Sequence, residues 1–337
     1  MSELASTVRA SGASWLGRVR SAEADDVVPV VLPFVLLAGL IVWLAFLLPT
    51  SLQSGQLVLT LDQSTVLILL AAGQVFVLLT GGIDLSVAGV LAVANGICAT
   101  HMHGQGSAIS IALAIVLLGW VPGAINGAII VFSGIKPIIV TLATWFIWSG
   151  VALVILPVAG GAIPLSVGNL WTGSFLGLAN VVWFALILAV ALLWIGRSGL
   201  VLRLRAIGSH PLGAFHSGVP IRRNVVIAYA LASWFAALGG LVLSAQSLSG
   251  DPGVGNSYLL PSIAAAVIGG TRLNGGVGAP FGALVGALVL GYVTQVTLAT
   301  GLAANWSLVF ASLILVLGVS IPALVHAVGR RLAMRRA

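Results

Sequence analysis

Apolar runs separated by short polar breaks cover most of the chain. A helix needs about 20 mainly apolar residues to cross a bilayer, whereas a membrane β-strand needs about ten that alternate in polarity. The runs here are continuous, so we predict an all-α, polytopic membrane protein with about ten transmembrane helices, some of them broken. The expected helices cover about residues 29–48, 63–80, 84–100, 108–132, 138–156, 178–196, 224–245, 258–268, 277–300 and 306–328.

The break between the second and third runs, residues 79–89, holds two glycines, Asp84 and Ser86. Backbone polar groups and charges within a membrane must find partners inside the protein, so this stretch predicts an interrupted helix beside protein or water. Two roles stay open for Asp84, a helix N-cap and a group that faces the solute. Asn126 could likewise bond between helices or contact the solute. Our candidates for the solute path are Asp84, Ser86, Asn126, Thr141 and Gln246.

Charge is scarce and unevenly placed. Only 6% of residues are charged and 60% are hydrophobic, whereas a soluble domain carries about 25% charged residues. Lys and Arg lie in short clusters beside the apolar runs, as topology-setting charges do. If the N-terminus is inside, ten spans place every cluster in the cytoplasm. We therefore expect residues 1–27 and the basic residues 329–337 to be cytoplasmic tails on a single transmembrane domain, 28–328.

Other classes of protein fit poorly. The net charge of +7 comes from these clusters and does not indicate nucleic-acid binding. Cys98 stands alone in an apolar run, which indicates packing, and His101 and His103 have no carboxylate nearby, so we expect no metal site. No catalytic set is evident, so we do not expect an enzyme. The one lysine, Lys136, precedes a proline, so the chain has no phosphate-binding loop for ATP.

The longest basic stretch, residues 197–223, is too patterned for a plain connector. It combines an Arg-rich entry, a Gly-Ser turn at 208–209 and a short helix ending at Gly218. Leu212, Phe215 and Val219 would lie along one edge of that helix, which suits docking into a groove on a soluble partner. The alternative is an interfacial helix lying on anionic lipid.

Four motifs in order along residues 30–325 resemble one family. They are Thr80–Ser86, Gly123–Gly127 with Ile135–Ala143, Arg205–Pro211 with Ser217–Val219, and Ala264–Gly276. Together they are similar to bacterial ABC importer permeases of the ribose, xylose and arabinose type, with branched-chain amino acid permeases as more distant relatives. Some positions depart from the family pattern, among them His210 where Asn is common, and these leave the solute open.

The resemblance implies a permease-type bundle of about ten spans in a bacterial inner membrane, which fits the lengths above. It implies a second permease copy, most simply a homodimer, and two ATP-binding subunits that hold ATP and Mg²⁺. It also implies a periplasmic or lipid-anchored substrate-binding protein. The loop that couples to the ATPase would contain Arg205, Ala206, Ile207, Gly208, Ser209, His210, Pro211, Leu212, Phe215, Ser217 and Gly218.

The leading hypothesis is therefore an ATP-driven importer subunit that moves a small polar solute, most simply a monosaccharide, by alternating access. A self-contained secondary transporter or channel is the alternative, and it would work without an ATPase. A proton-coupled transporter usually needs several buried ionisable groups, and only Asp84 is a candidate here. An integral-membrane enzyme is disfavoured because the chain offers no catalytic set.

Overall fold

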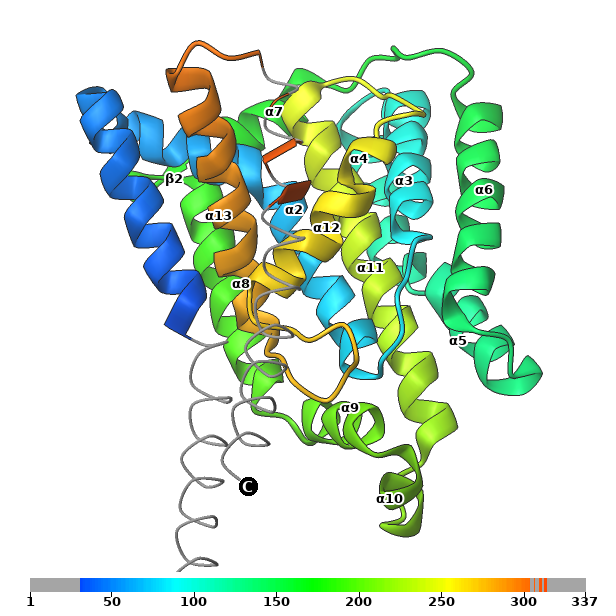
Figure 1. Ribbon diagram of the computed structural model, residues 1–337. Helices are drawn as coiled ribbons and strands as arrows, with labels where there is room; N and C mark the ends of the chain where they lie inside the picture. Colours follow the sequence, from blue (N-terminus) through cyan, green and yellow to red (C-terminus); the bar gives the residue numbers. More distant parts are fainter. Residues whose placement is uncertain (1–30, 304–305, 307–308, 311, 314–337) are drawn as a thin grey trace, which may run out of the picture.

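The computed structural model describes residues 31–303, 306, 309–310 and 312–313, and these form a helical bundle (Figure 1). Within these residues the strands are the two-residue β1 and β2, so the predicted all-α class is confirmed. The expected tenth span and both tails lie almost wholly outside the described residues. The first helix runs Val31–Leu47. The elements after it are η1 (Pro49–Leu52), α2 (Ser54–Leu79), α3 (Val87–His101), α4 (Gln105–Leu118), α5 (Val121–Ser133), α6 (Pro137–Ile155), α7 (Leu165–Thr172), β1 (Ser174–Phe175), β2 (Leu178–Ala179), α8 (Asn180–Gly196), α9 (Gly199–Ser209), α10 (Pro211–His216), α11 (Ile221–Ser247), α12 (Asn256–Ile268) and α13 (Pro280–Ala299).

The helices agree with the predicted spans up to the ninth. Among the described residues, five helices are long and apolar enough to cross a membrane, and α8 with α9 makes a sixth if that bent pair is one span. Three shorter apolar helices, Val31–Leu47, α3 and α12, account for the remaining predicted runs. One boundary was wrong, because α2 begins at Ser54 instead of about residue 63. The polar residues in the first part of α2 are compatible with a helix because they find partners on other helices. Gln63, for example, accepts a hydrogen bond from Gln295 Nε2 on α13 at 2.9 Å.

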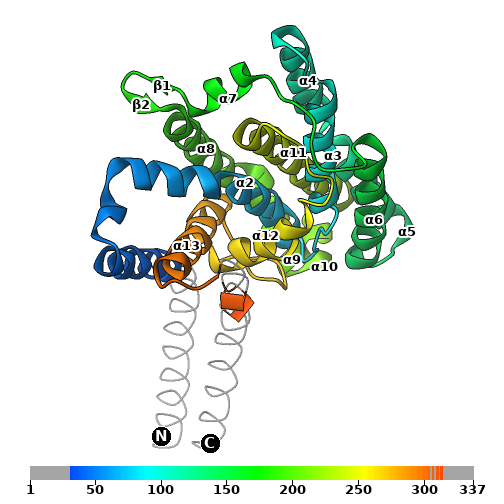
Figure 2. The same ribbon diagram turned by 90° about the horizontal axis from the view of Figure 1, so that it is seen from above.

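Helix α2 is the centre of the bundle. Every residue from Ser64 to Leu79 is buried, and the helix packs against α11, α13, α12, α8 and α9 (Figure 2). A helix that is apolar on all sides belongs in an interior of this kind. The most hydrophobic stretch of the second span therefore contacts protein and not lipid.

Helices α5 and α11 cross at very short range. A Cβ added at Gly123 would overlap the carbonyl oxygen of Tyr229 and lie 2.6 Å from Ser233 Cβ, and one added at Gly127 would lie 2.7 Å from Val226 Cα. The spacing Gly123-xxx-Gly127 places both glycines on one helix face, the arrangement by which membrane helices pack closely. The fourth predicted span is interrupted at Gly119 and Trp120, between α4 and α5. Pro122 then lies in the first turn of α5, where proline is tolerated.

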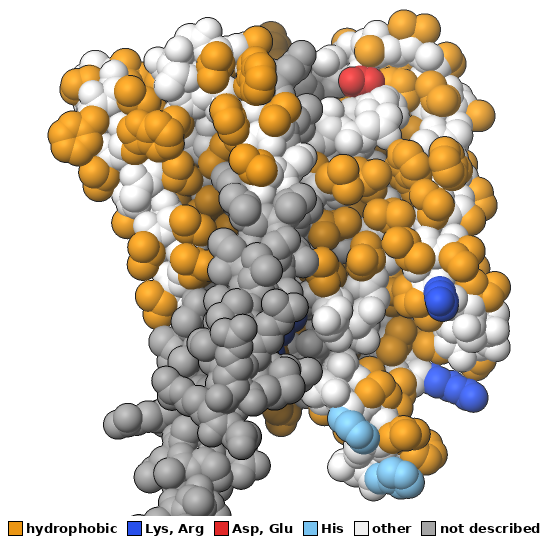
Figure 3. All heavy atoms as spheres, in the orientation of Figure 1, with side chains coloured by type: hydrophobic (Ala, Val, Ile, Leu, Met, Phe, Trp, Pro, Cys, Tyr) orange, Lys and Arg blue, Asp and Glu red, His pale blue; other side chains and the backbone are white. Residues whose placement is uncertain are grey.

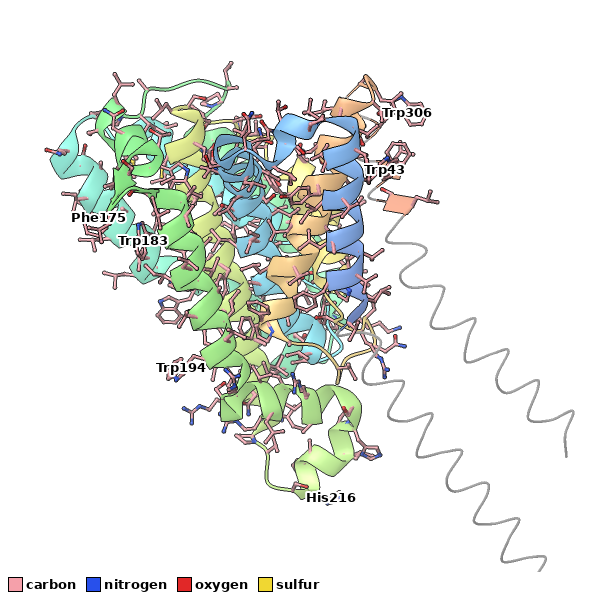
Figure 4. All side chains as sticks on the ribbon, turned by 90° about the vertical axis from the view of Figure 1, so that its left-hand side faces the viewer. Trp43, Phe175, Trp183, Trp194, His216 and Trp306 are labelled. Atoms are coloured by element: carbon pink, nitrogen blue, oxygen red, sulfur yellow. The ribbon has the colours of Figure 1, made fainter. Side chains whose placement is uncertain are left out.

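The two ends of the bundle differ in charge. On the face in Figure 3, Lys and Arg side chains lie in the lower half, and the visible acidic side chain lies near the top. The lower end carries α9 and α10 (Figure 1) and is called the basic end below. The opposite end carries α7 and the hairpin of β1 and β2. There Trp183 Nε1 donates to the Phe175 carbonyl at 2.9 Å, and both rings are labelled in Figure 4.

Candidate functional site

The basic stretch folds into two helices, where one turn and one helix were predicted. Gly208 and Ser209 belong to α9, so the predicted Gly-Ser turn is wrong. Helix α9 bends away from α8 by 61° and buries Val201, Leu204 and Ile207 against the bundle. The apolar spacing of these three positions follows the helical period, which explains why the glycine does not end the helix. Helix α10 ends at His216, and Gly218 turns the chain with a φ of +76°.

Helix α10 projects from the basic end, with His216 at its far tip (Figure 4). His210 caps it, because His210 Nδ1 accepts a hydrogen bond from the Gly213 backbone N–H at 2.8 Å. The side chains of Leu212 and Phe215 are 69% and 65% exposed. Val219 does not share their edge as predicted, because it follows the end of α10 and packs half-buried against the core. The exposed edge of α10 is therefore formed by Leu212 and Phe215.

Four of the five candidates for the solute path meet at the break after α2, where each is buried. Asp84 Oδ1 accepts hydrogen bonds from the backbone N–H of Ser86 at 2.9 Å and from its Oγ at 2.6 Å. Asn126 Nδ2 on α5 donates to Ser86 Oγ at 2.7 Å. Thr141 Oγ1 on α6 donates to the Ile83 carbonyl at 3.1 Å. This network ties the break to two further helices, and it holds the backbone N–H just ahead of α3.

Two buried residues of this region carry signals that the sequence prediction missed. Gln74 is the one polar side chain in the apolar run 66–79, and its Nε2 donates to the Asp84 carbonyl at 2.5 Å. Tyr229 on α11 is fully buried, and a Cβ added at Gly82 would overlap its hydroxyl. Among the described residues, the Tyr229 hydroxyl, Asp84 Oδ2 and Asn126 Oδ1 have no hydrogen-bond partner. The break is thus a buried polar region of the interior, surrounded by side chains from α2, α5, α6 and α11.

Gln246 lies apart from this network, near the other end of α11. Counted along the helix axis it is about 25 Å from Tyr229, at 1.5 Å per residue. Its Nε2 donates to Asp62 Oδ1 at 2.9 Å and to the Asp62 carbonyl at 2.7 Å. Trp171 Nε1 on α7 donates to the same Oδ1 at 2.6 Å. The structure therefore does not bring Gln246 together with the other four candidates.

A hollow lined by both polar and apolar residues opens between α2, α12 and α13. Its volume is about 190 Å³, less than the roughly 300–1,000 Å³ of pockets that enclose a drug-sized ligand. Six of its lining residues carry hydroxyl or amide groups: Thr60, Gln63, Ser64, Ser257, Tyr258 and Thr294. The sequence prediction missed this set because its members lie on three helices that are distant along the chain. Within the described ranges no three His, Cys, Asp or Glu side chains group as metal ligands.

The structure is that of a multi-pass membrane protein, with membrane-length helices around a buried core, polar groups in the interior and an apolar-edged helix at the basic end. Residues 56–319 match the family of the branched-chain amino acid transport system permease component, and the chain belongs to this family. It is a translocation subunit of an ABC transporter, not the subunit that hydrolyses ATP. The predicted family and multi-pass class are confirmed.

Relatives cover almost the whole chain. The ribose import permease protein RbsC of Bacillus subtilis is 34% identical over 302 residues, which cover 88% of this chain and 93% of the relative. The galactose/methyl galactoside import permease protein MglC of Salmonella typhimurium is 31% identical, with 87% of this chain and 94% of the relative covered. A probable ABC transporter permease protein, y4mJ of Sinorhizobium fredii, is 28% identical, with 77% and 78% covered. No solved structure matches the chain.

Proposed function

We propose that this permease is the membrane-spanning subunit of an ATP-driven importer for a monosaccharide. The relatives named for ribose and for galactose support a sugar as the solute. The interior fits such a solute, because hydroxyl and amide groups bond sugar hydroxyls without the cost of a buried charge. Which monosaccharide is carried is left to the experiment below.

The observation that carries the proposal is the exposed edge of α10. Burying a large apolar side chain stabilises a contact by about 1.5–3 kcal/mol, so Leu212 and Phe215 together favour docking into an apolar groove. Helix α9 holds this edge away from the bundle, where an ATP-binding subunit can receive it. In this arrangement the coupling segment is 197–223, and ATP and Mg²⁺ are bound by the partner subunit.

The distribution of charge supports an orientation. Positive charge favours the cytoplasmic side, so the basic end would face the cytoplasm and both tails, 1–27 and 329–337, would lie there. The opposite end, with α7 and the Asp62 network, would receive solute from a periplasmic or lipid-anchored binding protein. The membrane would be the bacterial inner membrane.

The hollow between α2, α12 and α13 suits one wall of a solute path. It is open to the outside of this chain, so this chain alone would not enclose a sugar on every side. A second permease copy facing it, most simply an identical one, would complete the path. The network around Asp84 and Asn126 is buried inside this chain. It would therefore influence the shape of the path from within the bundle.

Uptake in a strain that lacks this gene tests the proposal. Deletion should abolish uptake of micromolar D-ribose, D-galactose or D-xylose, and a plasmid copy should restore it. A copy carrying Leu212→Asp and Phe215→Asp should reach the membrane and fail to restore it. The control is Leu202→Asp, at an exposed leucine on α9 that lies outside the edge of α10, and it should restore uptake.

Uptake should survive an uncoupler while ATP is maintained, and it should stop when ATP is depleted. The reverse pattern would identify a secondary transporter, and no change for any sugar would refute the proposal.

A further inference from the structure

Three glycine segments that are distant along the chain meet at one point of the basic end. They are Gly81 after α2, Gly208 in α9, and Gly275 with Gly276 in the loop after α12. We propose that this glycine junction transmits movement of α10 to two helix breaks at once, and that Gly208 and Arg205 are its positioning residues. The inference rests on the proposed function, since it assigns the route by which the docked ATPase would move the bundle.

Gly208 leaves no room for a side chain. A Cβ added there would overlap the Leu79 carbonyl oxygen at the end of α2, and it would lie 2.5 Å from the backbone N of Gly276. A Cβ at Gly275 would lie 2.8 Å from the backbone N of Gly81. The three backbones are therefore in direct contact, with no side chain between them.

Hydrogen bonds hold the junction together. The Gly276 N–H donates to the Leu79 carbonyl at 3.0 Å, which joins the loop after α12 to the end of α2. Arg205 donates from Nε at 3.0 Å and from Nη2 at 2.6 Å to the Gly278 carbonyl. A charged, two-donor bond of this kind is stronger than a neutral one and fixes the angle between its partners. Helix α9 is thus fastened to the loop and packed against the end of α2.

The backbone at the junction needs glycine for its conformation as well as for its size. Gly81, Gly275 and Gly276 have φ values of +81°, +87° and +79°, a region that L side chains rarely adopt. The loop reverses here and leads two residues past Gly278 into α13, and the α2 side leads through Gly82 to the Asp84 network. A tilt of α9 would therefore shift the α2–α3 break and the α12–α13 break together.

Figure 1 shows this arrangement, with α9 crossing beneath the lower end of α2 and the loop that follows α12. Helix α10 hangs from the same end, so a push on α10 reaches the junction through the short α9. Packed backbones with no intervening side chain transmit displacement well, because close-packed interiors deform little.

The ratio of sugar molecules imported to ATP molecules hydrolysed tests the inference. The complex of this permease with its ATP-binding subunit and binding protein is reconstituted in liposomes, with D-ribose as the first probe and D-galactose as the second. Gly208→Ala should keep the ATPase bound and active, since α10 is untouched, but lower the ratio at least tenfold. Gly150→Ala in α6 is the control outside the coupling segment, because an added Cβ there meets nothing within 4 Å. Its ratio should equal that of wild type.

Arg205→Lys keeps the test decisive if Gly208→Ala fails to assemble. Lysine preserves the charge but not the two-donor bond to Gly278, so the ratio should fall while the amount of assembled complex stays constant. A wild-type ratio in the assembled variants would overturn the inference and leave the proposed function standing. Absence of ATP-dependent uptake in the wild-type complex would instead refute the proposed function.

Discussion

The crossing of α5 and α11 gives a stability prediction that the structure quantifies. Gly123→Ala adds one methyl group where Ser233 Cβ would be 2.6 Å away and the Tyr229 backbone carbonyl closer still. No rotamer relieves a clash with backbone, so the two helices must separate. Overpacking of this kind costs about 1–3 kcal/mol.

Two further terms enter the balance. Separation would stretch the hydrogen bond from Ser233 Oγ to the Gly119 carbonyl, now 2.7 Å long, which is worth about 0.5–1.5 kcal/mol. Replacing a glycine within a helix recovers about 0.5–1 kcal/mol of backbone entropy. We therefore expect Gly123→Ala to lower the free energy of unfolding by about 0.5–4 kcal/mol.

Gly150→Ala in α6 is the matched control. It is also a glycine in a membrane-length helix, but an added Cβ meets nothing within 4 Å. Only the entropy gain applies, so stability should be unchanged or rise by up to about 1 kcal/mol. Unfolding of the purified protein in mixed micelles, followed by tryptophan fluorescence as the SDS fraction rises, measures both variants. Equal midpoints for the two variants would show that the α5–α11 contact is looser than the distances require.

Three more predictions follow from single contacts. Asp84→Ala removes the acceptor of both hydrogen bonds from Ser86 and should lower the free energy of unfolding by about 1.5–3 kcal/mol in the same assay. Asp84→Asn keeps an oxygen acceptor and should lower it clearly less. Equal losses for the two variants would contradict this role. Trp171→Phe keeps an aromatic ring but loses the hydrogen bond to Asp62, so it should lower the free energy of unfolding by about 1 kcal/mol. An unchanged unfolding midpoint would count against that bond. Phe215→Glu should leave the midpoint unchanged and abolish co-purification with the ATP-binding subunit; retained binding would contradict docking through α10.

The sequence predicted where the helices are, because the bilayer sets their length and composition. The apolar runs did not predict α7 or α9, but they placed the apolar helices within a few residues. The polar start of α2 was the exception, since Gln56, Asp62 and Gln63 looked like a loop until partners on α7, α11 and α13 were known. Periodicity along one segment carries no information about which distant polar groups will meet it.

Glycine was the residue type that sequence patterns resolved least well. A Gly-Ser pair is typical of a turn, yet Gly208 lies in a helix because α9 must approach the end of α2. Gly123 and Gly127 were recognised only as part of a family motif, and their role depends on α11. Gln74 and Tyr229 were missed for a related reason, since a single polar group in an apolar run reveals its function only through its neighbours.

The enclosed position of α2 has a consequence for the way the protein is made. Helix α2 leaves the ribosome early, yet α11, α12 and α13, which cover it, are synthesised more than 140 residues later. Until residues 221–299 are inserted, the part of the α2 surface that α11, α12 and α13 cover lies against lipid or the insertion machinery. Contacts so distant along the chain form late and slowly. Biogenesis of this permease therefore ends with the C-terminal half closing around a helix that was inserted at the start.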